Sequence, residues 1–241
     1  MKTLSKTLIA AAVAGSAGLA HAEISGNVAL ATDYMFRGVS QTDNQMALQG
    51  GFDWAHDSGF YVGTWASNVD SNFFSGTSTD PQLEVDLYAG FGGEMGEIGY
   101  DLGVIRYNYP GYDDANTTEL YVGASYSLSE DASVGATFYY SPELNFVGVD
   151  ESAWYLSLDG EVAVAEGFTL AAHVGFSDGD AYDSVASGGL GSDYIDYSLG
   201  VSTEAAGVGL DLSYIGTNND GEDVFGGVAD DRVVFTVSKS F

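Results

Sequence analysis

Apolar and polar residues alternate with a period of two along most of this chain, which is the pattern of β-strands that present two different faces. The alternation predicts twelve strands at residues 26–37, 47–56, 59–67, 82–91, 98–108, 118–127, 133–141, 152–161, 168–177, 194–203, 208–216 and 231–241. Most of these segments are nine to twelve residues long. Globular strands average about 5–6 residues, whereas a tilted membrane-spanning strand needs about 9–11. The lengths therefore favour a membrane barrel.

The predicted connections alternate between short and long. The short ones are residues 57–58, 92–97, 128–132, 162–167 and 204–207, and the long ones are 38–46, 68–81, 109–117, 142–151, 178–193 and 217–230. Outer-membrane barrels have short periplasmic turns and longer external loops on alternate hairpins, whereas a soluble sandwich has no reason to sort its loops. The sequence therefore predicts an all-β, up-and-down antiparallel transmembrane barrel with both termini in the periplasm.

The two faces of the predicted strands differ in charge. Ten mid-strand acids lie in the phase opposite the large apolar residues: Asp33, Asp53, Glu84, Asp86, Asp101, Glu119, Asp159, Glu161, Asp196 and Asp211. In a membrane barrel the apolar face touches lipid and the polar face lines the interior. A soluble secreted β-protein would instead gather Leu87, Leu102 and Phe235 in a dry centre. Aromatic residues near both ends of the apolar face, such as Trp54 and Trp154, are typical of membrane girdles and favour the first arrangement.

Composition narrows the possible partners. The 241 residues include 33 Gly and 16 Tyr, which favour strands and turns over helices. There are 6 Lys and Arg against 35 Asp and Glu, for a net charge of −29. Nucleic acid is excluded as a partner, because phosphate binding needs a basic surface. The absence of cysteine excludes disulfides and cysteine-based zinc sites.

The two ends of the chain carry targeting features. Residues 1–22 combine Lys2 and Lys6, an apolar stretch and Ala20-His21-Ala22, which together predict a cleaved secretory signal before a barrel of residues 23–241. The final strand ends in Phe241, which resembles the assembly signal read by the barrel insertion machinery. We expect the protein to reside in the outer membrane of a Gram-negative bacterium, with lipid and that machinery as partners.

One segment resembles a known family. Residues 25–42 contain the core Asp33-Tyr34-Met35-Phe36-Arg37-Gly38-Val39-Ser40-Gln41, which is similar to the opening of the TorF-family porins. Residues 59–68 and 107–111 are also similar, and the likeness weakens after residue 141. The resemblance implies an outer-membrane β-barrel. It adds little about the solute, because the function of that family is poorly defined.

The inward acids predict the chemistry of the lumen. Rings of Asp and Glu favour cations, so we expect passive diffusion of small hydrophilic solutes or ions, with cations preferred, through an acidic, Tyr-lined lumen. Arg37 and Arg232 share the polar phase, whereas Arg106 faces lipid unless a bulge intervenes. The loops at residues 68–81 and 178–193 are the candidates for folding inward and narrowing the passage.

Asp33 and Arg37 lie four residues apart on the predicted strand 26–37 and therefore on one face. The arginine could select solutes through a transverse field across the pore. The simpler interpretation is a structural ion pair that fixes the first loop.

Neither a metal site nor catalysis is well supported by sequence. The six long loops contain sixteen acids and no Lys or Arg, and the densest groups are Asp178, Asp180, Asp183, Asp220, Glu222 and Asp223. Such oxygen clusters can hold Ca²⁺ or Mg²⁺, but their spacing is not that of an EF-hand, and solvated acidic loops are the favoured interpretation. His173 is the one histidine on an inward strand position, and no motif pairs it with a nucleophile. We therefore expect no enzyme and no cofactor.

The strand number leaves one alternative open. Twelve strands lie between the filled eight-stranded barrels and the open sixteen-stranded porins. The alternative to a channel is a plugged, structural barrel whose acidic external loops bind ions or partners.

Overall fold

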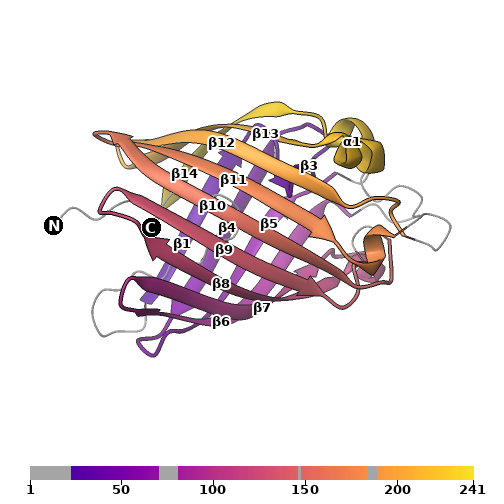
Figure 1. Ribbon diagram of the computed structural model, residues 1–241, viewed down its shortest axis with the longest axis horizontal. Helices are drawn as coiled ribbons and strands as arrows, with labels where there is room; N and C mark the ends of the chain where they lie inside the picture. The colour runs from indigo at the N-terminus through magenta and orange to yellow at the C-terminus, as the bar shows by residue number, and fades with distance from the viewer. Residues whose placement is uncertain (1–22, 71–80, 146–147, 184–188) are drawn as a thin grey trace.

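The computed structural model describes residues 23–70, 81–145, 148–183 and 189–241, which form a closed twelve-stranded antiparallel β-barrel (Figure 1). Its strands are β1 (Glu23–Ala31), β4 (Ala47–Ala55), β5 (Phe60–Asn68), β6 (Leu83–Met95), β7 (Ile98–Asn108), β8 (Thr117–Ser127), β9 (Ala132–Ser141), β10 (Ala153–Ala165), β11 (Phe168–Asp178), β12 (Tyr194–Ala205), β13 (Val208–Thr217) and β14 (Arg232–Ser240). Each strand pairs with the next along the chain, and β1 pairs with β14 to close the ring. The predicted fold class is confirmed. The expected signal segment, residues 1–22, lies outside the described residues.

The long connections carry the remaining elements, which gather at one end of the barrel, opposite the chain termini (Figure 1). They are the strands β2 (Met35–Phe36) and β3 (Val39–Ser40), the α-helix α1 (Asn219–Phe225), and the 3-10 helices η2 (Asp113–Ala115), η4 (Asp180–Tyr182) and η6 (Gly226–Val228). None of the helices in the described ranges has the length and apolar character to cross a membrane.

Eleven of the twelve predicted strands agree with the structure to within four residues, and the first is wrong. Residues 26–37 were expected as one strand, but β1 ends at Ala31 and the chain turns into the hairpin of β2 and β3. Arg37 and Gly38 form its two-residue turn with φ of 49° and 77°, the left-handed pair that a type I′ turn requires. Apolar and polar residues alternate in a hairpin as they do in a continuous strand, so the pattern did not reveal the break.

The apolar face of the strands points outward. Leu87, Leu102 and Phe235 are 55%, 48% and 42% exposed, so they do not meet in a common centre. The expectation for a soluble protein is therefore contradicted. An outer surface with this many exposed large hydrophobic residues is what lipid covers in membrane barrels.

The abundance of Gly and Tyr has a common cause in the barrel wall. A Cβ atom added at Gly63 would overlap the ring of Tyr88, and one added at Gly90 would overlap Tyr61. The inward tyrosine rings therefore lie flat against the wall, in the space that a side chain on the neighbouring strand would otherwise occupy. Glycine is needed here for close approach rather than for turns.

Candidate functional site

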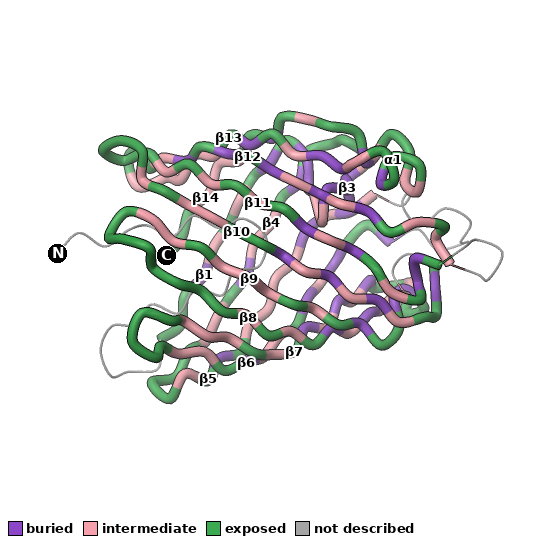
Figure 2. The backbone as a smooth tube through the Cα atoms, in the orientation of Figure 1, coloured by how far each residue is buried: buried purple, intermediate pink, exposed green. Residues whose placement is uncertain are grey.

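The inward residues of the barrel are buried at the long-loop end and, on most strands, more exposed toward the short-turn end (Figure 2). The inward row of β8 shows the gradient: Thr117 and Glu119 are buried, Tyr121 and Gly123 are intermediate, and Ser125 is exposed. Among the described residues, the accessible part of the interior therefore lies at the short-turn end and is called the vestibule below, although the inward row of β12 stays buried as far as Ser202. It opens where the chain termini lie and ends against a packed core at the loop end.

Much of that packed core is supplied by residues 33–42, which contain β2 and β3 and are called the lumen hairpin below. Tyr34, Val39 and Thr42 are each at most 8% exposed. The ring of Phe36 packs on Tyr107 with centroids 5.7 Å apart. The first long connection thus folds inward, and sequence reasoning did not select it.

The two loops expected to fold inward are only partly described. Residues 71–80 of the first and 184–188 of the second lie outside the described residues. In the second loop, Ala181 and Tyr182 of η4 are buried, and the ring of Tyr182 lies 5.9 Å from that of Tyr194. This part of the loop therefore joins the packed core beside the lumen hairpin.

Two ion pairs join the lumen hairpin to the barrel wall. Arg37 Nη2 lies 2.7 Å from Glu119 Oε2, and Arg232 Nη1 lies 2.9 Å from Asp33 Oδ2. Asp33 also accepts hydrogen bonds from the hydroxyls of Ser40 and Thr42, at 2.6 and 2.8 Å. The expected pairing of Asp33 with Arg37 on one strand is wrong, because the chain leaves the strand at Ala31 and each residue finds a partner far away in sequence.

Arg37 is held by aromatic rings as well as by its carboxylate. Its guanidinium carbon lies 4.1 Å from the ring centroid of Tyr155 and 5.3 Å from that of Tyr139. Tyr194 donates a hydrogen bond of 3.1 Å to the Arg37 carbonyl. Burial alone would lower the pKa of Arg37, but the Glu119 carboxylate together with Tyr107 and Tyr155 raises that pKa above its ordinary value. The guanidinium therefore stays charged inside the barrel.

Three candidate acids lie in the packed core rather than on a wet wall. Glu84, Asp86 and Glu119 are 2%, 4% and 1% exposed. Tyr34 of the lumen hairpin donates to Glu84 Oε1 at 3.0 Å, and Tyr107 donates to Glu119 Oε2 at 3.0 Å. Glu84, through Tyr34, and Glu119, through Arg37, therefore help to hold the hairpin.

A second set of acids lies on the wall of the vestibule. Asp53 and Asp101 accept hydrogen bonds from Tyr88 and Tyr61, the latter at 2.7 Å. Asp211 accepts from Ser213 at 2.6 Å, and its side chain is partly exposed. Each of these three partly exposed acids thus has a hydroxyl partner on the inner wall.

His173 has neighbours that the sequence motifs did not reveal. Its Nδ1 lies 2.7 Å from Asp159 Oδ1, and its Nε2 lies 2.9 Å from Asp196 Oδ1 and 2.9 Å from the Tyr155 hydroxyl. Asp159 and His173 are direct partners across β10 and β11. Asp159 and His173 are the same number of residues away from residue 166, which lies in the turn between β10 and β11. Their contact could have been predicted from this symmetry.

The His173 cluster does not have the geometry of a catalytic triad. Ser157 Oγ lies 3.4 Å from Nδ1, the same ring nitrogen that contacts Asp159. The Ser157 hydroxyl instead donates to Asp159 Oδ2 at 2.5 Å, so it is not directed to the imidazole as the nucleophile of a serine triad is. Asp196 is 2% exposed, and Asp159 carries a side chain that is 47% exposed at the edge of the vestibule.

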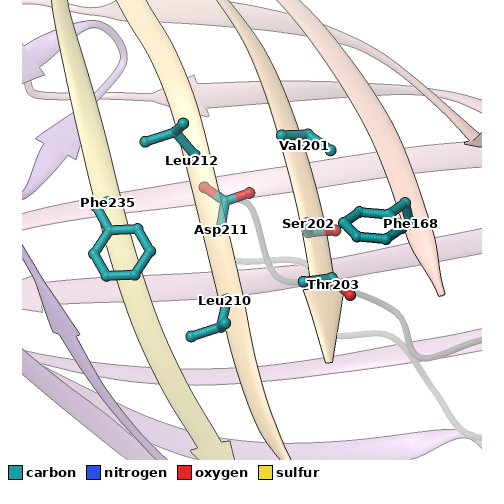
Figure 3. A pocket seen from close by; sticks show the side chains of 8 residues that line it. All are labelled: Phe168, Val201, Ser202, Thr203, Leu210, Asp211, Leu212 and Phe235. Carbon is teal, nitrogen blue, oxygen red and sulfur yellow. The ribbon is translucent and has the colours of Figure 1, made fainter. Parts of the chain in front are cut away.

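The remaining candidates lie outside the lumen. Arg106 donates to Thr118 across two strands at 2.8 Å, on the outer phase. The backbone of Phe241 pairs with Gly26 through bonds of 2.9 and 3.0 Å, which extends the seam between β1 and β14. A hollow near the short-turn end crosses β11 to β14 (Figure 3). It is lined by Phe168, Val201, Ser202, Thr203, Leu210, Asp211, Leu212 and Phe235.

The acidic loop residues do not gather around a common point. Asp178 accepts from the Gly179 backbone at 2.6 Å, and Asp180 accepts from Ser152 at 3.0 Å. Asp220 accepts from Asn218, the N-cap residue of α1, at 2.7 Å. Within the described ranges, the His, Asp and Glu side chains form no group of three or more that could hold a metal ion.

Comparisons with known proteins agree with this architecture. A family model described as "Bacterial protein of unknown function (Gcw_chp)" matches residues 15–241. No curated protein matches the sequence. A solved structure described as "KdgM porin in complex with disordered oligogalacturonate" is similar, with a TM-score of 0.58, 10% identity, and coverage of 90% of this chain and 98% of that one. The NanC porin is similar with a TM-score of 0.57, 9% identity, and coverage of 90% and 98%. At these identities the likeness concerns the fold alone.

Proposed function

We propose that this chain, which belongs to the Gcw_chp family of bacterial proteins, is an outer-membrane channel for small hydrophilic solutes or ions. The observation that carries the proposal is a closed barrel with an apolar outer surface and a water-exposed, acidic vestibule inside. Such a wall conducts polar solutes across a membrane without exposing them to lipid. A narrower relation, to the TorF porins, rests on the likeness of residues 25–42, 59–68 and 107–111.

The mechanism we propose is diffusion controlled by the lumen hairpin. Solutes enter the vestibule at the periplasmic end and meet the packed core at the external end. Passage requires the lumen hairpin to shift. That shift breaks two ion pairs, Arg37 with Glu119 and Asp33 with Arg232. Packed interiors switch between discrete arrangements rather than deforming continuously, so conductance should appear in steps.

A preference for cations is part of the proposal. The KdgM structure contains oligogalacturonate, which is a polyanion and therefore opposite in charge to the solutes proposed here. Asp53, Asp101 and Asp211 line the vestibule here, whereas Arg37 and Arg232 are engaged by carboxylates. The local field therefore favours cations and neutral solutes over polyanions.

Planar-bilayer recording of the refolded full-length protein tests the channel. Discrete conductance steps are expected, with reversal potentials that indicate cation preference in a salt gradient. Replacing both Asp101 and Asp159 by Asn should reduce that preference. Replacing Glu84 by Gln and Asp86 by Asn tests the acids of the packed core. These replacements should reduce cation preference only if the lumen hairpin moves aside during conduction.

The second candidate is a plugged structural barrel, and the packing of the lumen hairpin favours it. Under this alternative, well-folded protein is silent in bilayers even after the hairpin anchors are removed. Discrete steps from the unmodified protein that become more frequent with Arg37→Gln would exclude a purely structural role. Membrane fractionation, and a mature N-terminus at Glu23, would test the proposed location and signal cleavage.

A further inference from the structure

A row of tyrosine rings runs along the inner wall of the barrel, from the vestibule into the packed core. Tyr121 and Tyr139 have ring centroids 5.7 Å apart, and Tyr139 and Tyr155 have centroids 5.9 Å apart. The hydroxyl of Tyr121 contacts that of Tyr61, and Tyr88 lies on β6, between the strands of these two residues. The row therefore crosses the inner face from β5 to β10.

These rings are fixed in place and present their faces to the interior. Tyr121 packs in the space that a side chain at Gly103 would take, as Tyr88 does at Gly63. Tyr61 is hydrogen-bonded to Asp101, and Tyr88 to Asp53. Tyr88 and Tyr121 remain partly exposed, so part of each ring is open to a solute in the vestibule. We call Tyr61, Tyr88, Tyr121, Asp53 and Asp101 the tyrosine shelf.

An unsatisfied acceptor adjoins the shelf. Asp86 precedes Tyr88 by two residues on the same inward row and is 4% exposed. Its Oδ1 has no hydrogen-bond partner within the part of the chain that the structure describes. A buried acceptor without a donor is unfavourable, but Asp86 lies in the packed core, so a solute in the vestibule reaches this atom only when the lumen hairpin shifts.

The charge around the shelf determines which solute fits. Asp53 and Asp101 bring two carboxylates to the shelf, and the lumen cations Arg37 and Arg232 are each paired with another acid. Open tyrosine faces attract cations through the ring quadrupole, and nearby carboxylates add to that attraction. When the lumen hairpin shifts, an ammonium group also supplies the N–H donor that Asp86 Oδ1 lacks.

We propose that the tyrosine shelf is a binding site for organic cations that carry primary ammonium groups. This inference rests on the proposed function, since it identifies a class of solute for the same vestibule. Neutral polyols would keep the contacts with the rings and lose the charge, and dicarboxylates would be repelled.

Three probes of equal chain length separate these possibilities: putrescine, 1,4-butanediol and succinate. Isothermal titration of the full-length, detergent-solubilised barrel should give saturable binding for putrescine alone. Tyr121→Leu and Asp101→Asn should each weaken putrescine binding by about fivefold, because each removes one contact with the cation. Matched controls are Tyr126→Leu, on the outer face of the same strand, and Asp131→Asn, in a short turn. Both should bind putrescine as the unmodified protein does.

Binding is measured without any current, so this test is separate from that of the channel. Butanediol binding as tightly as putrescine would overturn the inference in favour of a neutral-solute site. Absence of saturable putrescine binding would overturn it too, even if the barrel conducts. A barrel that is silent in bilayers but binds putrescine on the shelf would support the site and refute the channel.

Discussion

Breaking the pair between Arg37 and Glu119 should release the lumen hairpin. The two side chains are 8% and 2% exposed, so Arg37→Gln leaves an uncompensated carboxylate in the packed core. Removal of one partner from a buried pair costs about 3–5 kcal/mol. Tyr107 still donates to Glu119, which places the expected cost near the lower limit. About 3 kcal/mol corresponds to a roughly 150-fold larger population of the displaced hairpin.

Thiol labelling measures this population directly, because the chain has no cysteine of its own. Val39 is 2% exposed, so a thiol introduced by Val39→Cys reacts with a maleimide only when the hairpin leaves the core. Adding Arg37→Gln should accelerate labelling by roughly 150-fold. Gln45→Cys, at an exposed position of the same loop, is the control and should label quickly in every background.

The double variant distinguishes a buried charge from general damage. Arg37→Gln combined with Glu119→Gln removes both charges, and labelling should return to within about tenfold of the starting rate. Equal labelling with and without Arg37→Gln would refute the claim that the ion pair holds the hairpin. A double variant that opens as readily as the single one would show that lost packing on Tyr155 and Tyr139, rather than the stranded carboxylate, is the cause.

Two further predictions concern the barrel wall. Gly175→Ala places a Cβ against the Tyr155 hydroxyl and Asp196 Oδ2, and should lower the free energy of unfolding by about 1–3 kcal/mol, whereas Gly135→Ala, with no atom nearer than 3.6 Å, should be nearly neutral. Urea titration in detergent with heat-modifiable gel mobility measures both, and equal effects would contradict the close-approach role of Gly175. Leu87→Arg on the outer face should cost about 2–4 kcal/mol in a bilayer, whereas Ser125→Arg at the wet end of the lumen should cost little. Refolding yield into lipid vesicles compares the two, and an equal loss would argue against lipid contact at Leu87.

Local pattern was sufficient for the strands and for their two faces. The apolar residues of the strand 82–91 alternate with Glu84, Asp86, Tyr88 and Gly90, and the division of the strand into two faces depends only on that alternation. The alternation of short and long connections then predicted the antiparallel order of the strands. The contact of His173 with Asp159 was also within reach, because the register of a hairpin follows from the position of its turn.

The sequence by itself determined a twelve-stranded barrel with an apolar exterior and inward acids, because those properties are repeated locally in every strand. Only the tertiary structure decided what those acids do. Asp33 meets Arg232 across 199 residues, and Arg37 meets Glu119 across 82, because closing the sheet brings distant strands around one lumen. The lumen hairpin shares the alternation of a strand, so its place inside the barrel depends on partners that no local pattern specifies.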